Sequence, residues 1–502
     1  MANFLFLTFY DKICLGPRIL SSIVKNAGHK SNLILFKEDS SDKIIWGKNK
    51  SSVNYEHYKN GFLRGSNYDI NAWTDKEIDL LVDLVLKLKP DVVCLSTRSF
   101  WTTLGNQIIT AIRRKMPKIP IVAGGWGPTL EPEKYLEYCD YVCFGEGEQT
   151  IVDIGKSIDN NKDFRNIKNI IYKGGVGTIY NDLYEPLKNL DSVPIPDFNL
   201  DNSYLIENNR ILKEEEFYNE KIYDVFVGRG CPLKCSYCMS GMWKDLYKKY
   251  GFNCLKIRTR DPKLCIEEIK RAKDNGAVVI RFKDEVFPFN KKWVAEFLKF
   301  YKKEINLPFF AYLRPEFHTI EMVEELYVAG LRTTGLGIQT GSENIRQNIY
   351  HRKCDNTKIA KFAEFLDVKG INYAYDIITN NPFESERDLK STFCFLCSLP
   401  FADLKVFKIK FFPGAPITNM LKLNNPTSLG DNLYKWYSVL YFMAVRNKML
   451  RKIAVVVEKI GLFKFLPSIL QAVMLPYLIS EKIKSRKMKK KYKTISASIP
   501  KP

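Results

Sequence analysis

The chain has 502 residues, of which 45% are hydrophobic and 26% are charged. This composition is typical of a globular protein and excludes a disordered or fibrous chain. At about 100–200 residues per domain, the length allows about three domains. Lys and Arg together number 77 against 56 Asp and Glu, a net charge of +21, so nucleic acid, anionic lipid and acidic substrates are all open as partners.

The first ten residues form a short apolar run without a basic segment or a small-residue cleavage site. We therefore expect a buried strand there rather than a secretory signal. The sequence has no run of about 18 uninterrupted apolar residues, which argues against a transmembrane helix. The twelve cysteines are not spaced like a disulfide framework, and in a long chain they indicate a reducing compartment with metal or redox chemistry. We expect a cytoplasmic protein, with peripheral attachment at the inner membrane face as an extension of that expectation.

The first 160 residues alternate short apolar runs with helical patterns. Strands are predicted at residues 3–8, 32–36, 91–96, 119–123 and 141–144. Helices are predicted at 17–26, 75–88 and 104–115, and residues 37–72 read as an irregular excursion. This alternation predicts an α/β fold, a Rossmann-like doubly wound parallel sheet over residues 1–160. Such sheets bind ligands at the carboxyl ends of their strands.

Residues 161–220 are predicted as a linker, because prolines and aspartates are concentrated near residues 191–197. A second alternating series follows. Its predicted strands are residues 223–228, 278–283, 308–313, 334–338, 372–378 and 405–411. Six strands separated by helical patterns predict a partial (βα)6 barrel over residues 221–416.

Three cysteines lie within eight residues directly after the first strand of this second series: Cys231, Cys235 and Cys238. Three thiolates are too few for a structural zinc site or a fully ligated [4Fe–4S] cluster, each of which needs four ligands. A loop that ligates three irons leaves the fourth open to a substrate or cofactor. The alternative is a zinc knuckle with a distant fourth ligand. Cys394 and Cys397 have a suitable spacing, but their apolar helical pattern favours buried core thiols.

This motif resembles the hallmark of the radical S-adenosylmethionine enzymes, and the resemblance spans about residues 223–416. It implies that Cys231, Cys235 and Cys238 hold a [4Fe–4S] cluster, shielded by Tyr237, whose fourth iron is chelated by S-adenosylmethionine. One electron, from a donor such as flavodoxin or ferredoxin, then cleaves the sulfonium. The 5′-deoxyadenosyl radical that results abstracts hydrogen from an unactivated carbon.

Further residues that match this family stand at the ends of later predicted strands. Asp284 and Glu285 follow the second strand, where a carboxylate can accept hydrogen bonds from the methionine ammonium. Arg314 follows the third and is suited to the methionine carboxylate. Gln339 ends the fourth, where family members often have Glu, and is expected to contact ribose or substrate. Residues 380–384 lack both glycines of the family's Gly-x-Pro-Gly-Glu loop, so a different backbone is expected there.

Residues 1–160 resemble the cobalamin-binding domain that precedes this barrel in one large subgroup. The resemblance implies cofactor-binding roles for Ser96, Gly124, Gly125, Thr129 and Glu146. Glycines at strand ends let backbone approach a large ligand that carries a phosphate. The Asp-x-His-x-x-Gly motif that supplies a histidine to cobalt is absent, since none of the four histidines has Asp two residues before it. A sheet that binds no cofactor is the alternative.

Residues 417–502 are predicted as a helical region with a basic tail. Residues 433–459 have a helical pattern, and residues 481–493 contain eight basic residues and one acidic residue. Basic residues beside an apolar helix favour contact with an anionic membrane surface. The alternative is a helical cap on the barrel followed by a solvated tail. No RNA-binding module is found, so nucleic acid is a less supported partner.

These resemblances together imply a cobalamin-dependent radical S-adenosylmethionine enzyme that methylates an unactivated carbon of a small-molecule or lipid-like substrate. A radical cyclase or oxidoreductase on the same scaffold, without methyl transfer, is the first alternative. A non-catalytic, membrane-attached corrin-binding protein is the second.

Overall fold

The computed structural model describes residues 1–11, 13–37, 54–59, 62–67, 73–198, 202–213, 221–253, 256–426, 428–462, 464, 466–467 and 469–470. The chain forms two compact units. The first unit comprises Met1–Val53, Tyr68–Thr334 and Phe411–Met420, and the second comprises Asn54–Asn67, Gly335–Lys410 and Leu421–Pro502.

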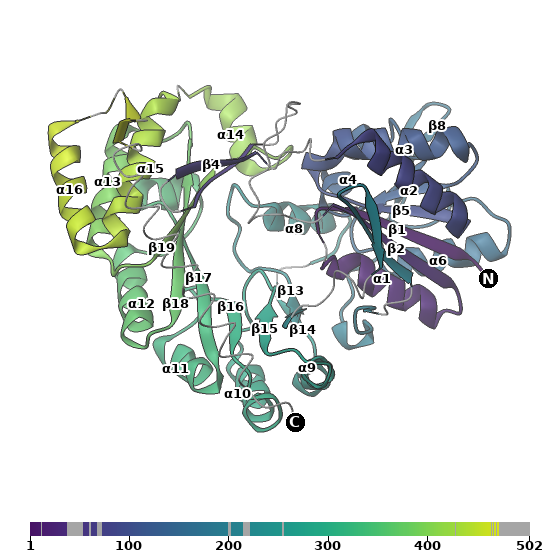
Figure 1. Cartoon of the computed structure of the whole chain (residues 1–502), viewed down its shortest axis with the longest axis horizontal. Coiled ribbons are helices and arrows are strands. Elements are labelled where there is room, and N and C mark those ends of the chain that lie inside the picture. Colours follow the sequence, from purple (N-terminus) through teal and green to yellow (C-terminus); the bar gives the residue numbers. More distant parts are fainter. Residues whose placement is uncertain are drawn as a thin grey trace. The chain divides into compact units, whose positions relative to one another are not determined.

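The first unit contains a nine-stranded sheet with the order β11-β10-β2-β1-β5-β6-β7-β8-β9 (Figure 1). Its five central strands are parallel. They are β2 (Lys30–Phe36), β1 (Asn3–Phe9), β5 (Val92–Ser96), β6 (Ile121–Gly124) and β7 (Tyr141–Cys143). The Rossmann-like parallel sheet predicted from the sequence is thereby confirmed.

Helices cover both faces of this sheet. One hydrophobic core includes residues of α2 (Asp75–Leu88) and α3 (Thr102–Lys115). The other includes residues of α1 (Leu15–Asn26) and α6 (Glu148–Asp159). Alternate residues of β1 enter opposite cores, as in Leu5 and Leu7 against Phe4 and Phe6. Because both faces are buried, the central strands read in sequence as continuous apolar runs.

The edges of the sheet lie in the segment predicted as a linker. The structure places β8 (Ile170–Gly174) and β9 (Gly177–Tyr180) at one edge, and β10 (Ser203–Glu207) and β11 (Arg210–Lys213) at the other. Residues 161–220 are therefore not the linker that was predicted: within the described residues, they supply four edge strands of the sheet. The turn between β10 and β11 is formed by Asn208 and Asn209, both with positive φ. Such a pair is a hairpin signal that the linker interpretation overlooked.

The polar excursion at residues 37–72 contributes to the second unit. Its strands β3 (Asn54–Lys59) and β4 (Phe62–Asn67) form an antiparallel hairpin. In that unit β3 pairs with β19 (Asp403–Lys408). Residues 38–53, 60–61 and 68–72 lie outside the described residues.

All six strands predicted for the partial barrel are present. The first unit holds β12 (Ile222–Val225), β15 (Val279–Phe282) and β16 (Phe309–Tyr312) as parallel neighbours. β17 (Leu331–Gln339) begins in the first unit and ends in the second, where the order is β17-β18-β19-β3-β4 with β18 at Asn372–Thr379. The helices between these strands are α9 (Pro262–Asp274), α10 (Lys291–Phe300), α11 (Ile320–Ala329), α12 (Asn356–Val368) and α13 (Glu386–Ser398). The strands predicted for one barrel domain are thus divided between the two compact units.

Three helices end the described chain: α14 (Pro416–Asn424), α15 (Asp431–Arg446) and α16 (Lys448–Ile460). α15 is almost wholly buried and packs on α13 and α16 in the second unit. Among the residues the structure describes, no helix is both long and apolar enough to span a bilayer. The basic tail at residues 481–493 lies outside the described residues.

Candidate cofactor site

The three cysteines of the motif lie on a loop between a short ribbon and a helix. The strand β13 (Gly228–Arg229) pairs antiparallel with β14 (Arg258–Thr259), and α8 (Met239–Lys249) follows the loop. Cys235 is buried, whereas Cys231 and Cys238 are half-buried. Gly230 has a φ of +103°, a conformation that favours glycine, so the chain can turn immediately before Cys231. Tyr237 is half-buried within the loop.

Asp284 holds the strand end that leads into this loop. Its Oδ1 accepts hydrogen bonds from the backbone N–H of Gly228 at 2.6 Å and of Val227 at 3.2 Å. Burial and the adjacent Glu285 raise the pKa of Asp284 well above its ordinary value, although these backbone hydrogen bonds oppose the shift. The two acidic residues therefore differ in position: Asp284 supports the loop, while Glu285 is exposed and lines a cavity.

A buried cation lies beside the three thiols. Lys244 on α8 is 5% exposed and donates a hydrogen bond to the Leu233 carbonyl at 3.0 Å. Burial lowers the pKa of Lys244, and the thiols of Cys231, Cys235 and Cys238 act in the opposite direction. All three thiols thus lie close enough to Lys244 to interact with its charge, which suits an anionic thiolate-ligated cluster.

The causes of the pKa shift of Cys231 also place this thiol near Cys238, Arg314 and Lys244. Burial raises this pKa and the neighbouring Cys238 raises it further, while the Leu233 backbone, Arg314 and Lys244 oppose the change. In the described ranges, no three His, Cys, Asp or Glu side chains converge closely enough to bind one metal ion together. A cubane needs no such convergence, because each of its thiolate ligands binds a different iron. The donor set therefore fits a [4Fe–4S] cluster.

Arg314 follows β16 and has an unsatisfied donor. Among the described residues its Nε is buried without a hydrogen-bond partner. His318 fixes the backbone at this point, because its Nδ1 accepts from the Arg314 N–H at 3.0 Å and its Nε2 lies 3.1 Å from the Phe287 carbonyl. Burial lowers the pKa of His318 to about 4, so it stays neutral near pH 7. A buried guanidinium with a spare N–H suits a carboxylate ligand.

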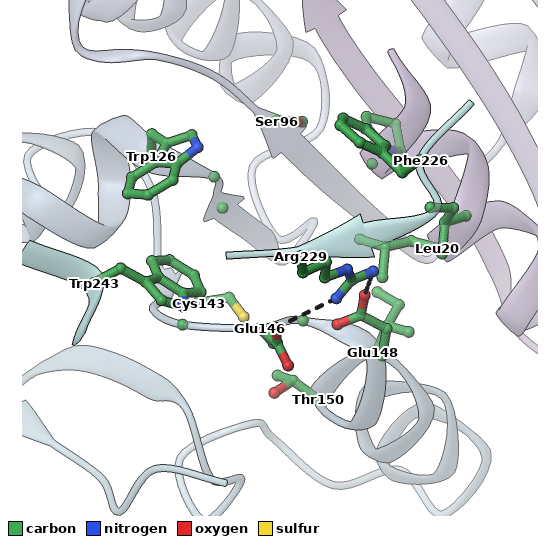
Figure 2. A pocket seen from close by; sticks show the side chains of 18 of the residues that line it. Leu20, Ser96, Trp126, Cys143, Glu146, Glu148, Thr150, Phe226, Arg229 and Trp243 are labelled. Atoms are coloured by element: carbon green, nitrogen blue, oxygen red, sulfur yellow. Dashed lines mark hydrogen bonds and ion pairs between the residues drawn. The ribbon is translucent and has the colours of Figure 1, made fainter. Parts of the chain in front are cut away.

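A cavity of about 350 Å³ lies between the first sheet and the cysteine loop, entirely within the first unit. Figure 2 shows the side chains that surround it, with Trp126 and Trp243 near one another and Phe226 and Leu20 on another wall. The ring centroids of the two tryptophans are 5.0 Å apart. Both Cys231 and Lys244 line the cavity, so the loop and the carboxyl ends of β5 and β6 open onto the same space.

Four of the five residues predicted to bind cobalamin line this cavity: Ser96, Gly124, Gly125 and Glu146. A Cβ on Gly124 would lie at ordinary contact distance, 3.8 Å, from Cys143 Cβ. Gly125 has a φ of +101°, and a Cβ there would lie 2.9 Å from the Thr97 carbonyl oxygen. Both glycines at the end of β6 therefore border the cavity with backbone alone, which lets a ligand approach the main chain closely.

Thr129 and Glu146 are engaged by the protein itself. Thr129 is not among the cavity-lining residues, and its Oγ1 accepts a hydrogen bond from the Gly145 N–H at 3.4 Å. Glu146 forms a bidentate pair with Arg258, at 2.6 and 3.1 Å, and its Oε2 also accepts from the Leu187 N–H. Burial opposes ionisation of Glu146, but the arginines hold its pKa below the ordinary value.

The Glu146 pair belongs to a network of four charges that the sequence did not suggest. Arg229 contacts Glu148 at 2.5 Å and Glu146 at 3.4 Å, as the dashed lines in Figure 2 show. The ribbon register places Arg229 opposite Arg258. We call these residues the charge quartet: Glu146, Glu148, Arg229 and Arg258. It joins the loop after β7 to the strand that precedes Cys231.

The second unit holds the remaining predicted residue and an unforeseen polar group. Gln339 ends β17 with a φ of +70° and is not among the residues that line the cavity. At the end of β18, buried atoms lack hydrogen-bond partners among the described residues: Thr379 Oγ1, Asn381 Nδ2 and Glu384 Oε2. Burial and the nearby Asp388 raise the pKa of Glu384 well above its ordinary value.

Two family models match separate parts of the chain. Residues 60–155 match the family model of the B12 binding domain, and residues 225–396 match that of the radical SAM superfamily. The cysteine loop and Asp284 fall within the second match, and the residues of β5 and β6 fall within the first.

Individual relatives are distant. An uncharacterized methyltransferase of Pyrococcus horikoshii is 23% identical over 359 residues, which cover 69% of this chain and 72% of the relative. The anaerobic magnesium-protoporphyrin IX monomethyl ester cyclase of Cereibacter sphaeroides is 24% identical over 254 residues, 48% of this chain but only 38% of the cyclase. The solved structure of the methyltransferase TsrM from Kitasatospora setae, with cobalamin and a [4Fe–4S] cluster, has a TM-score of 0.62 at 14% identity, covering 84% of this chain and 78% of TsrM.

The cysteine loop at the first barrel strand and the match over residues 225–396 define a radical S-adenosylmethionine enzyme. The domain that precedes the barrel places the chain more narrowly, in the group of radical S-adenosylmethionine proteins that carry a B12-binding domain. The cofactors of this group are S-adenosylmethionine, a [4Fe–4S] cluster and cobalamin.

Proposed function

We propose that this protein transfers a methyl group from S-adenosylmethionine to an unactivated carbon of a small-molecule or lipid-like substrate. The observation that carries the proposal is the shared cavity, which is lined both by Ser96, Gly124 and Gly125 of the sheet and by Cys231 of the cysteine loop. A corrin and a cluster-bound S-adenosylmethionine would therefore meet in one space. The names of the Pyrococcus relative and of TsrM, both methyltransferases, support the same reaction.

The chain's own residues have distinct tasks in this proposal. Cys231, Cys235 and Cys238 would each ligate one iron, with Tyr237 covering the cluster. Arg314 would bind the carboxylate of S-adenosylmethionine through its unsatisfied Nε, and Glu285 is the exposed carboxylate available for the ammonium. When bound, the cluster supplies the electron that cleaves S-adenosylmethionine, and cobalamin supplies the methyl group.

The walls of the cavity exclude water from reactive species. Trp126 and Trp243 on one wall and Phe226 and Leu20 on another give the cavity a largely apolar lining. Such a lining protects a radical from side reactions with solvent. Gln339 is proposed as a ribose or substrate contact from the resemblance alone. The domain boundaries 1–160, 221–416 and 417–502 are likewise proposals.

The first experiment tests the cluster. Anaerobically reconstituted protein should bind about four irons per chain and, with a reductant, convert S-adenosylmethionine to 5′-deoxyadenosine. Cys235→Ala should lose both properties. Cys394→Ala is the matched control, since Cys394 is exposed on α13, and it should behave like the unchanged protein. Cleavage of S-adenosylmethionine by the Cys235→Ala protein would overturn the assignment.

Methyl transfer is tested separately. With labelled methyl on S-adenosylmethionine, S-adenosylhomocysteine should form alongside 5′-deoxyadenosine once substrate and cobalamin are supplied, and the label should enter the product. The similarity to the cyclase of Cereibacter sphaeroides favours a second candidate, a radical cyclase or oxidoreductase on the same scaffold. In that case 5′-deoxyadenosine would form without label in the product.

Two partners are proposed beyond the substrate. Reduction of the cluster calls for a one-electron donor such as flavodoxin or ferredoxin. The C-terminal region is proposed to contact a membrane, a contact that does not depend on the methyl transfer.

A further inference from the structure

Exposed apolar side chains are concentrated at the C-terminal end of the second unit. Of the seventeen large hydrophobic residues that are exposed in the described chain, eight lie between residues 449 and 469. They are Met449, Ile453, Val455, Val456, Ile460, Leu462, Leu466 and Ile469. Isolated exposed apolar residues are ordinary, but a contiguous group marks an interaction surface.

Four of these residues form one stripe on α16. Met449, Ile453, Val456 and Ile460 follow the i, i+4, i+7, i+11 spacing of a helix face. They are between 42% and 69% exposed. The neighbouring stripe, Leu450, Ala454 and Val457, is buried, and α16 packs on α15. The helix therefore needs only its inner stripe for folding, and the outer stripe is available for another partner.

A row of lysines borders the outer stripe. Lys448, Lys452 and Lys459 are all exposed and lie about 90° round the helix axis from the centre of the stripe. Within the described residues none of the three forms an ion pair. The acidic residue of the helix, Glu458, is on another side and pairs with Lys390 at 3.0 Å. Arg451 is also turned inward, where it donates to the Leu399 carbonyl.

We infer that this surface binds an anionic phospholipid bilayer, with α16 lying in the plane of the interface. The α16 face is defined as Met449, Ile453, Val456 and Ile460 with Lys448, Lys452 and Lys459. An apolar stripe bordered by lysines is the arrangement of interfacial helices, in which apolar residues enter the acyl boundary and lysines meet the lipid phosphates. The unpaired positive charge favours anionic lipid over a second copy of this basic chain, because like charges would repel.

The test uses the full-length reconstituted protein and vesicles of phosphatidylcholine, with or without about one third phosphatidylglycerol. Cosedimentation should be strong only with the anionic vesicles. Ile453→Asp/Val456→Asp should weaken the partition roughly tenfold or more. Replacing Lys448, Lys452 and Lys459 by Gln should weaken it roughly a hundredfold, at about fivefold per lysine. The control is Val328→Asp/Val368→Asp, which introduces the same two charges at exposed residues on α11 and α12 and should bind normally.

Several outcomes would overturn the inference. Persistent binding by the Ile453→Asp/Val456→Asp protein would assign the contact to another segment, such as residues 471–502. If the unchanged protein bound no lipid but sedimented as a dimer, and the same double substitution made it a monomer, the surface would be assigned to a second copy. Unchanged thermal unfolding of the variants keeps misfolding apart from lost binding. Unchanged 5′-deoxyadenosine formation separates failure of the membrane contact from failure of the proposed reaction.

Discussion

Buried acidic side chains near the cofactor cavity have hydrogen-bond partners in the protein, whereas in the part of the chain that the structure describes, the buried acidic side chain at the end of β18 has an oxygen without one. In the first unit, Glu146 has two arginines and a backbone N–H, and Asp284 has two backbone N–H groups. In the second unit, Glu384 Oε2 and Asn381 Nδ2 are buried without partners among the described residues. A buried polar group without a partner costs about 1–3 kcal/mol, so Glu146 and Asp284 are satisfied by the protein's own groups, whereas Glu384 Oε2 and Asn381 Nδ2 are not satisfied by any described group.

This difference concerns what holds each region in place. The ion pairs of the charge quartet hold the strand before Cys231 against the sheet, so this part of the cofactor site is formed without a bound ligand. The end of β18 lacks such pairs and carries a cost in the folded protein. Substitutions that remove charge should therefore destabilise the first region and stabilise the second.

The largest effect is expected at the charge quartet. Arg258→Met removes the bidentate partner of Glu146 and leaves that buried carboxylate with the longer contact to Arg229 and the Leu187 N–H. Loss of one partner from such a pair costs about 3 kcal/mol in the free energy of unfolding. Denaturant unfolding measures it. Arg114→Met is the control, since Arg114 is exposed, and should change stability by less than about 0.5 kcal/mol. Equal effects of the two substitutions would contradict the role of the quartet.

The next effect concerns the backbone at the end of β6. Gly125→Ala places a Cβ at positive φ and 2.9 Å from the Thr97 carbonyl oxygen, and should cost about 2 kcal/mol. Gly124→Ala meets no heavy atom within 3.8 Å and should fold with nearly unchanged stability. Thermal unfolding of the two proteins compares neighbouring glycines in the same turn. If both were equally stable, Gly125 would not be held in its strained conformation.

These contacts mark how far the sequence could be interpreted. The cysteine motif is local, with three ligands in eight residues, and the alternation of strands and helices predicts the parallel strands of both sheets but not β3, β4 or β8–β11. The charge quartet joins residues 81 and 112 positions apart, which no local pattern reveals. The resemblance implies cofactor binding by Glu146 and Thr129. The structure adds contacts that the resemblance does not contain: the Glu146 carboxylate pairs with Arg229 and Arg258, and Thr129 Oγ1 accepts a hydrogen bond from the Gly145 N–H.

A smaller effect, of the opposite sign, is expected in the second unit. Glu384→Gln keeps the shape of the side chain and removes an ionisable group whose charged form burial disfavours. At pH 7 it should raise the free energy of unfolding by about 1 kcal/mol. The control, Glu364→Gln on the exposed side of α12, should have no effect. Destabilisation by Glu384→Gln would show that the carboxylate has a stabilising partner.

The finest test uses pH, because the two carboxylates have pKa shifts of opposite direction. Glu146 has a lowered pKa, so its contribution to stability is present above the ordinary value of 4.5 and is lost as the pH falls below it. Glu384 has a raised pKa, so the folded protein keeps a proton that the unfolded chain releases, and stability falls as the pH rises above 4.5.

Across pH 4 to 8, the loss of stability caused by Glu146→Gln should therefore be smallest at the acid end, and the gain of stability from Glu384→Gln should be smallest there too. Asp284 shares the raised direction, but it is present in both variants and cancels from the differences. Denaturant midpoints for each variant against the unchanged protein measure these differences, and a gain from Glu384→Gln that is independent of pH would mean that its carboxyl titrates normally.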